Sequence, residues 1–84
     1  MQKTNPVFVK IIADMAIFLE FTSAESLNED VAVGMMEQLA ATLGTLDEEE
    51  KSSLTAELKE VSTSYPDEKI CRFVRDLPAS FGLI

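Results

Sequence analysis

The sequence predicts an all-α fold, a small four-helix bundle-like domain that covers residues 1–84. Four segments place apolar residues at helical spacing, and helix-capping residue types stand at their starts. No segment shows the alternation of a strand, and no hairpin dipeptide appears. Connections of three to six residues favour antiparallel neighbours. A chain of 84 residues suffices for one small domain and is too short for two.

The first helix is expected over residues 6–21, and it is apolar on almost every side. Asn5 is placed to cap it, and the proline that follows is favoured at the first helical position. Only Lys10, Asp14 and Glu20 interrupt the apolar run. Because such a helix needs neighbours on most sides, we expect it to be the central member of the fold.

The second helix is expected over residues 28–43, with Asn28 as its N-cap. Gly44 is expected to stop it. Gly34 lies inside this helix, where glycine costs about 1 kcal/mol relative to alanine. We therefore expect Gly34 to mark the close approach of another backbone, that of the first helix. Two overlapping rows have helical spacing, one of Ala32, Met36, Leu39 and Leu43 and one of Val31, Met35 and Leu39. We expect Met35 and Met36 to pack in the core, and the alternative is that they line an adaptable binding groove.

The third helix is expected to begin at Asp47. Asp47 and Glu50 have the spacing of a capping box, and the acids that begin this helix oppose its positive end. Leu54, Leu58 and Val61 form a narrow apolar stripe, while the other positions are largely polar. We expect this helix on the outside of the fold, in contact with the core along one seam.

The fourth helix is expected to start at Ser64 or Tyr65, with Pro66 in its first turn, and to end at Pro78. The apolar tail, residues 79–84, either packs back on the bundle or reaches across to a second copy. The buried stripe of the helix is expected to comprise Ile70, Phe73, Val74 and Leu77.

The residue types present exclude several kinds of chemistry. The chain has no histidine and a single cysteine, Cys71, which leaves no zinc pattern, no internal disulfide and no Cys–His nucleophile. The acids at 47–50 lack the spacing of an EF-hand. We expect no catalytic residue, no cofactor and no metal, hence a protein that is not an enzyme. The lack of a disulfide framework fits a reducing compartment, so we expect the cytoplasm.

The apolar run at 6–21 is also the one candidate for a signal peptide or membrane span. Its three charges lie where the apolar core of a signal peptide should be uncharged. It has 16 residues, whereas a span needs about 20. We therefore expect a soluble helix and no association with membranes.

The net charge of −8 is unevenly distributed. Residues 1–10 contribute +2 through Lys3 and Lys10, residues 11–50 contribute −10 without any cation, and residues 51–84 are neutral. Such a field suits the steering of a basic protein partner and disfavours nucleic acid. The alternative is that the acids serve solubility and helix capping. The leading candidates for an acidic partner-binding face are Glu29, Asp30, Glu37 and Glu48.

Two resemblances to known families follow from these features. In size, acidity and helix content the chain resembles bacterial toxin-immunity proteins, which neutralise basic nucleases by charge complementarity. The tripeptide Glu25-Ser26-Leu27 resembles that of acyl and peptidyl carrier proteins, in which the serine bears a phosphopantetheine arm. The carrier motif normally has Asp before the serine and a long loop ahead of it, and this chain has neither. The alternative for Ser26 is an ordinary turn or cap residue.

The excess of apolar residues predicts self-association. A four-helix monomer has too little surface to cover a helix that is apolar nearly all round, and exposed apolar patches usually mark contacts. A two-fold dimer is the commonest way to cover them. We expect a homodimer that forms through the first helix and the apolar tail, with contacts from Val7, Phe8, Ile11, Ile12, Met15, Leu19, Phe81 and Leu83.

Overall fold

A computed structural model describes residues 4–84 and confirms the all-α prediction. These residues form four helices and no strand, so the predicted number of helices is also confirmed. Lys3, one of the two N-terminal cations, lies outside the described residues. The helices are α1 (Pro6–Phe21), α2 (Glu29–Leu43), α3 (Glu48–Ser62) and α4 (Glu68–Ser80).

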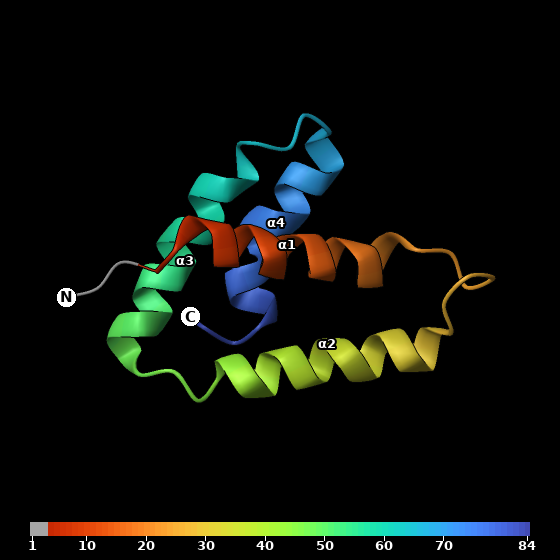
Figure 1. The fold of residues 1–84 in the computed structure, drawn as a ribbon, viewed down its shortest axis with the longest axis horizontal. Coiled ribbons are helices and arrows are strands. Elements are labelled where there is room, and N and C mark those ends of the chain that lie inside the picture. Colours follow the sequence, from red (N-terminus) through yellow and green to blue (C-terminus); the bar gives the residue numbers. More distant parts are fainter. Residues whose placement is uncertain (1–3) are drawn as a thin grey trace.

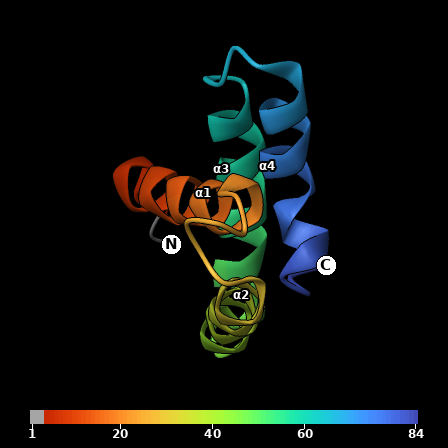
Figure 2. The same ribbon diagram turned by 90° about the vertical axis from the view of Figure 1, so that its right-hand side faces the viewer.

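The helices are arranged as two antiparallel pairs that cross each other (Figures 1 and 2). α3 and α4 form a hairpin, α1 lies across it, and α2 returns beside α1 in the opposite direction. α1 packs against all three other helices, whereas α2 packs chiefly against α1. The prediction that the first helix is the central member is therefore confirmed.

Side chains cap the first three helices where the sequence predicts. Asn5 accepts the backbone N–H of Val7 at 2.9 Å, and Asn28 accepts two N–H groups in the first turn of α2. At α3 the capping box is complete, since the Glu50 N–H donates to the Asp47 carboxylate at 2.7 Å and the Asp47 N–H donates to the Glu50 carboxylate at 3.1 Å. These caps satisfy backbone N–H groups that have no partner within the helix.

We expect the Asp47→Ala substitution to lower the free energy of unfolding by about 1 kcal/mol, because it leaves the start of α3 uncapped. Asp47→Asn keeps a side-chain acceptor and should recover most of the loss. Glu49→Ala is the control, since it removes an acid from the same turn without removing the cap. Urea unfolding followed by circular dichroism measures all three. Equal losses for Asp47→Ala and Glu49→Ala would show that charge, and not capping, stabilises this turn.

The fourth helix begins later than predicted. Asp67 is its N-cap and accepts the N–H of Ile70 at 3.1 Å, so Pro66 precedes the helix and does not lie in its first turn. The prediction of a start at Ser64 or Tyr65 was wrong because the Asp67 carboxylate caps the helix, which therefore begins at Glu68. The residues before it form the turn that joins α3 to α4.

The fourth helix also ends later than predicted, since Pro78 lies inside α4. Proline lacks the N–H that would bond to the carbonyl four residues earlier, so a single backbone bond is lost there. The following groups still find partners: the Phe81 N–H donates to the Leu77 carbonyl and the Leu83 N–H donates to the Pro78 carbonyl, both at 2.8 Å. The Pro78 ring is fully buried, and this burial offsets the missing bond.

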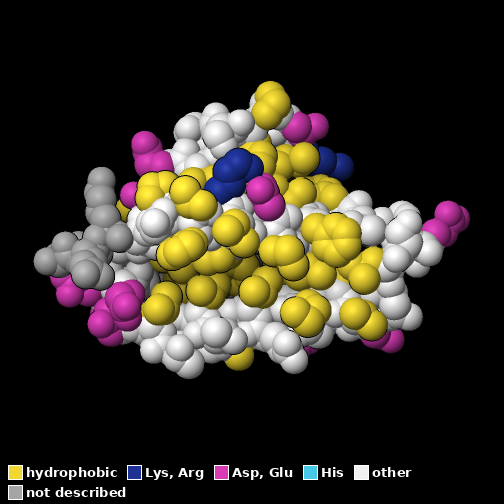
Figure 3. All heavy atoms as spheres, viewed as in Figure 1, with side chains coloured by type: hydrophobic (Ala, Val, Ile, Leu, Met, Phe, Trp, Pro, Cys, Tyr) yellow, Lys and Arg dark blue, Asp and Glu magenta, His cyan; other side chains and the backbone are white. Residues whose placement is uncertain are grey.

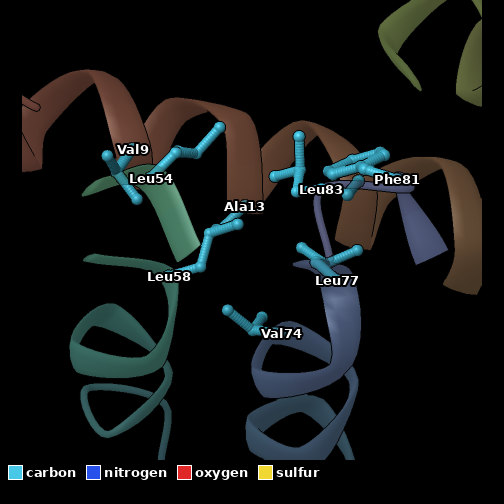
Figure 4. Packing of buried hydrophobic residues seen from close by; sticks show 9 residues of the cluster. Val9, Ala13, Leu54, Leu58, Val74, Leu77, Phe81 and Leu83 are labelled. Atoms are coloured by element: carbon cyan, nitrogen blue, oxygen red, sulfur yellow. The ribbon is translucent and has the colours of Figure 1, made fainter. Parts of the chain in front are cut away.

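The core lies where α1 crosses the α3–α4 hairpin (Figure 4). α1 contributes small side chains, Val9, Ala13 and Ala16, all 0% exposed. Short side chains at a contact allow two helices to approach closely. The hairpin and the tail supply the larger members of the cluster, which are Leu54, Leu58, Val74, Leu77, Phe81 and Leu83.

α3 is more central, and α2 more peripheral, than the sequence predicts. Leu54 and Leu58 of α3 are buried between α1 and α4, whereas α2 buries only Ala32. The other members of its predicted row are half-buried, namely Met36, Leu39 and Leu43. Gly34 lies on the exposed side of α2, and a Cβ there would have no neighbouring heavy atom within 4 Å. The predicted close approach at Gly34 is therefore wrong.

The C-terminal tail packs back onto its own fold. Gly82 has a φ of +72°, a left-handed conformation that glycine adopts without steric penalty. This turn brings Leu83 back to the core, where Phe81 is also buried. Of the two arrangements predicted for the tail, packing on the bundle is confirmed.

Candidate interaction surface

α1 exposes several of its large apolar side chains to solvent, while its alanines Ala13 and Ala16 face the core. Five of the large side chains, which we call the α1 face, are 44–64% exposed, although the two alanines at the core are fully covered. Exposed apolar side chains gathered in this way usually mark a contact surface. The α1 face consists of Val7, Phe8, Ile11, Met15 and Phe18.

The surrounding surface is also apolar and carries few charges. Figure 3 shows hydrophobic side chains gathered along α1 and onto neighbouring α2, with most acidic side chains at the margin. Three large apolar side chains of α2 are exposed, namely Val31, Val33 and Met35. A shallow hollow of about 480 Å³ adjoins the α1 face, lined by residues that include Val7, Ile11 and Val61.

The charges on α1 beside this face are neutralised locally. Lys10 Nζ lies 3.0 Å from the Asp14 carboxylate, one helical turn along. The Tyr65 hydroxyl donates to the same carboxylate at 2.5 Å, and Lys10 Nζ lies 5.0 Å from the centre of the Tyr65 ring. This cluster ties α1 to the turn between α3 and α4, and it leaves little net charge on the flank of the α1 face.

The contacts in this cluster shift the pKa values of its members. The hydrogen bond from Tyr65 lowers the pKa of the Asp14 carboxyl, and its bond to Lys10 acts in the same direction against partial burial. The hydrogen bond to Asp14 raises the pKa of the Lys10 ammonium. Burial raises the pKa of the Tyr65 phenol, and the bond to Asp14 adds to this. The phenol therefore stays protonated as a donor at neutral pH.

We expect the Tyr65→Phe substitution to raise the pKa of Asp14 towards its ordinary value of about 3.9, because the ring stays and the donor is lost. A carboxyl whose folded-state pKa is lowered adds stability above its unfolded pKa, and loses it as the pH falls through the folded value. The wild type should thus lose more stability than the variant below about pH 4. Carboxyl carbon shifts followed by NMR measure the midpoint. An Asp14 midpoint that is the same in both proteins would contradict the role given to Tyr65.

The structure divides the residues predicted for self-association into two groups. Val7, Phe8, Ile11 and Met15 are exposed, and Ile12 is half-buried. The other three contribute to the core of the monomer, so no contact with a second copy is assigned to them, namely Leu19, Phe81 and Leu83. They are buried because α1 turns this side towards α2 and because the tail folds back.

Phe18 belongs to the α1 face but is missing from the prediction. It is 51% exposed. Its position three residues after Met15 and seven after Ile11 places it on the same side of the helix. Helical spacing alone could therefore have identified Phe18 once the solvent side of α1 was known.

The predicted acidic face is not one cluster. Glu29 and Asp30 lie at the start of α2, whereas Glu48 follows its end. The two ends of this 15-residue helix are about 21 Å apart. Glu48 lies 3.9 Å from the Lys51 ammonium. Glu37 is exposed in the middle of α2 and lines a cleft together with Glu20.

Ser26 lies in the turn between α1 and α2, two residues before the N-cap Asn28. Its side chain is exposed, and its backbone N–H donates to the Ser23 carbonyl at 3.0 Å. Ser26 thus occupies a turn and does not begin a helix. Nothing in its surroundings favours a carrier function over the alternative of a turn residue.

The described residues offer little support for a metal site, a reactive cysteine or a membrane span. Cys71 is half-buried on α4, and residues 4–84 hold no cluster of three or more metal-ligating side chains. None of the four described helices has the length and apolar character needed to cross a membrane. No protein-family model, curated protein sequence or solved structure matches the chain.

Proposed function

We propose that this protein is a non-catalytic interaction module that forms a two-fold symmetric homodimer through the α1 face. One observation carries the proposal: α1 leaves five large apolar side chains 44–64% exposed, including Phe8 and Phe18. In a monomer this distribution leaves hydrophobic surface in water and forgoes its burial. A second copy that covers the face recovers that stabilisation.

The size of the surface suits a dimer. Phenylalanine side chains bury about 150–250 Å² each, so two half-exposed ones alone offer on the order of 200 Å². With its three aliphatic side chains, the α1 face offers on the order of 500 Å², near the upper end for the largest patch of a monomer. A standard interface buries roughly 800 Å² per partner, so the α1 face would supply more than half of one.

The spacing along α1 suits a two-fold axis. Phe8, Ile11, Met15 and Phe18 are separated by three, four and three residues, an order that reads the same in both directions. If two α1 helices pair antiparallel about the centre of this set, Phe8 of each copy meets Phe18 of the other. Ile11 then meets Met15 of the second copy, as an isologous interface requires.

The charges agree with the same pairing. Lys10 and Asp14 lie on one flank of the face, close to the centre of the set. Antiparallel pairing brings the Lys10 of each copy near the Asp14 of the other, so the only charges of α1 that border the face attract across the interface. A basic partner would gain little here, because this flank has no net charge.

Sedimentation equilibrium tests the proposal. At tens of micromolar we expect a mass twice the 9.3 kDa of the chain. The dimer should persist when the salt concentration is raised, because apolar contacts are not screened by ions. A monomer at these concentrations would contradict the proposal.

Disulfide formation tests the antiparallel register, in a background that carries Cys71→Ser. The double variant Phe8→Cys, Phe18→Cys should oxidise to a covalent dimer. In the antiparallel pairing, the thiol at position 8 of one copy lies opposite the thiol at position 18 of the other. Phe8→Cys alone should not form a covalent dimer, since the two copies of position 8 would lie about 15 Å apart along the helices, well beyond disulfide reach. Rapid cross-linking of the single variant would instead indicate a parallel pairing.

A further inference from the structure

A second surface of the molecule is a cleft between α2 and the end of α4. It has a volume of about 340 Å³. Figure 2 shows that α4 lies on the side of α3 away from α1, and that its C-terminal end comes close to α2. Of the α2 residues that line the cleft, only Ala32 is buried. Its apolar lining includes Leu19, Ala32, Met36, Phe73 and Phe81.

The shape of the cleft suits a helix. Ala32, Met36 and Ala40 line it from α2 at spacings of four residues, which is one side of that helix over about 12 Å. Grooves between helices commonly receive the apolar side of an amphipathic helix. Met36 is half-buried, and methionine is flexible enough to adapt to side chains that enter.

The charge of the cleft specifies the polar side of its ligand. Glu20 of α1 and Glu37 of α2 line it together, and both are exposed. Neither takes part in an ion pair within the described residues, and no Lys or Arg is among the residues that line the cleft. A ligand that carries cations beside an apolar strip would pair with both carboxylates.

We propose that this cleft binds a basic amphipathic helix of a partner protein. The apolar residues of that helix enter between α2 and α4, while its lysines or arginines meet Glu20 and Glu37. The net charge of −8 steers such a ligand to the protein and falls in effect as salt rises. The α1 face takes no part, so the proposal is independent of the homodimer.

The methionines allow a direct test by methyl NMR. Met36 lines the cleft, Met35 is its neighbour outside the lining, and Met15 belongs to the α1 face. The probe is a synthetic 14-residue peptide of leucine and lysine with all leucines on one helical side. We expect a saturable shift of the Met36 methyl, with Met15 unchanged at constant protein concentration. A permuted peptide of the same composition, without an apolar side, should bind at least about tenfold more weakly.

Charge variants decide whether the cleft itself is the site. The double variant Glu20→Gln, Glu37→Gln should weaken binding of the amphipathic peptide about tenfold at low salt, as expected for two ion pairs. The control Glu49→Gln, Glu60→Gln removes the same charge elsewhere and should change binding less than about twofold. Equal losses in the two double variants, no shift of Met36, or equal binding of both peptides would overturn the proposal. Self-association is measured separately, by the change of the Met15 methyl shift with protein concentration in the absence of peptide.

Discussion

The Leu58→Ala substitution should lower the free energy of unfolding by about 2–5 kcal/mol, the range for leucine truncation in a packed core. Leu58 is 0% exposed and lies in the cluster where α1 crosses the hairpin, with Ala13 on α1 and Val74 on α4 among its members. The neighbours on α1 are too small to fill the space that truncation leaves. A domain of this size has about 4–13 kcal/mol in total, so the loss would be a large fraction of it.

Val33→Ala is the control for this prediction. Val33 is an aliphatic residue on α2 that is 56% exposed, and truncating it should change the free energy of unfolding by no more than about 0.5 kcal/mol. Urea unfolding measures both variants at one protein concentration, because self-association would make stability depend on concentration. A loss at Leu58 no larger than that at Val33 would mean that the core is not where the packing places it.

The sequence is most informative where structure depends on neighbouring residues. The starts of α1, α2 and α3 were predicted because Asn5, Asn28 and Asp47 bond to backbone N–H groups two or three residues away. α4 follows the same rule, but two possible starts compete. Pro66 suggested the earlier one, and the carboxylate of Asp67 determines the later one.

Burial was harder to predict because it depends on the tertiary arrangement. The apolar stripe of α2 is as regular as that of α3, but α2 has one principal neighbour and α3 has two. Leu54 and Leu58 are therefore covered, whereas Leu39 and Leu43 are only half-covered. Periodicity shows which side of a helix is apolar and does not show how much of the fold will cover it.

The candidate surface was predictable in kind but not in its membership. A surplus of apolar residues on the first helix pointed to a contact surface, and α1 does expose Val7, Phe8 and Ile11. Which side of α1 faces outward was not available from its sequence, because both sides are apolar. The packing of Ala13 and Ala16 on the hairpin decides it. The same packing accounts for the exposure of Phe18.

The Ile11→Glu substitution should dissociate the proposed homodimer. Ile11 is 54% exposed near the centre of the α1 face, so a carboxylate is tolerated in the monomer and would be buried without a partner in the dimer. The two-fold axis introduces the charge twice, which places both carboxylates in one interface. Uncompensated burial of a charge costs about 3–5 kcal/mol, so the dissociation constant should rise by at least about 100-fold.

Ile84→Glu is the matched control for the dissociation. Ile84 is 77% exposed at the C-terminus, outside the α1 face, and it adds the same charge. Sedimentation equilibrium should return a monomer for Ile11→Glu and a dimer for Ile84→Glu, with unchanged helical circular dichroism in both. If the two variants weaken association equally, repulsion between acidic chains is the cause and the α1 face is not the interface. If Ile11→Glu remains dimeric, the large side chains on α1 face solvent for a reason other than self-association.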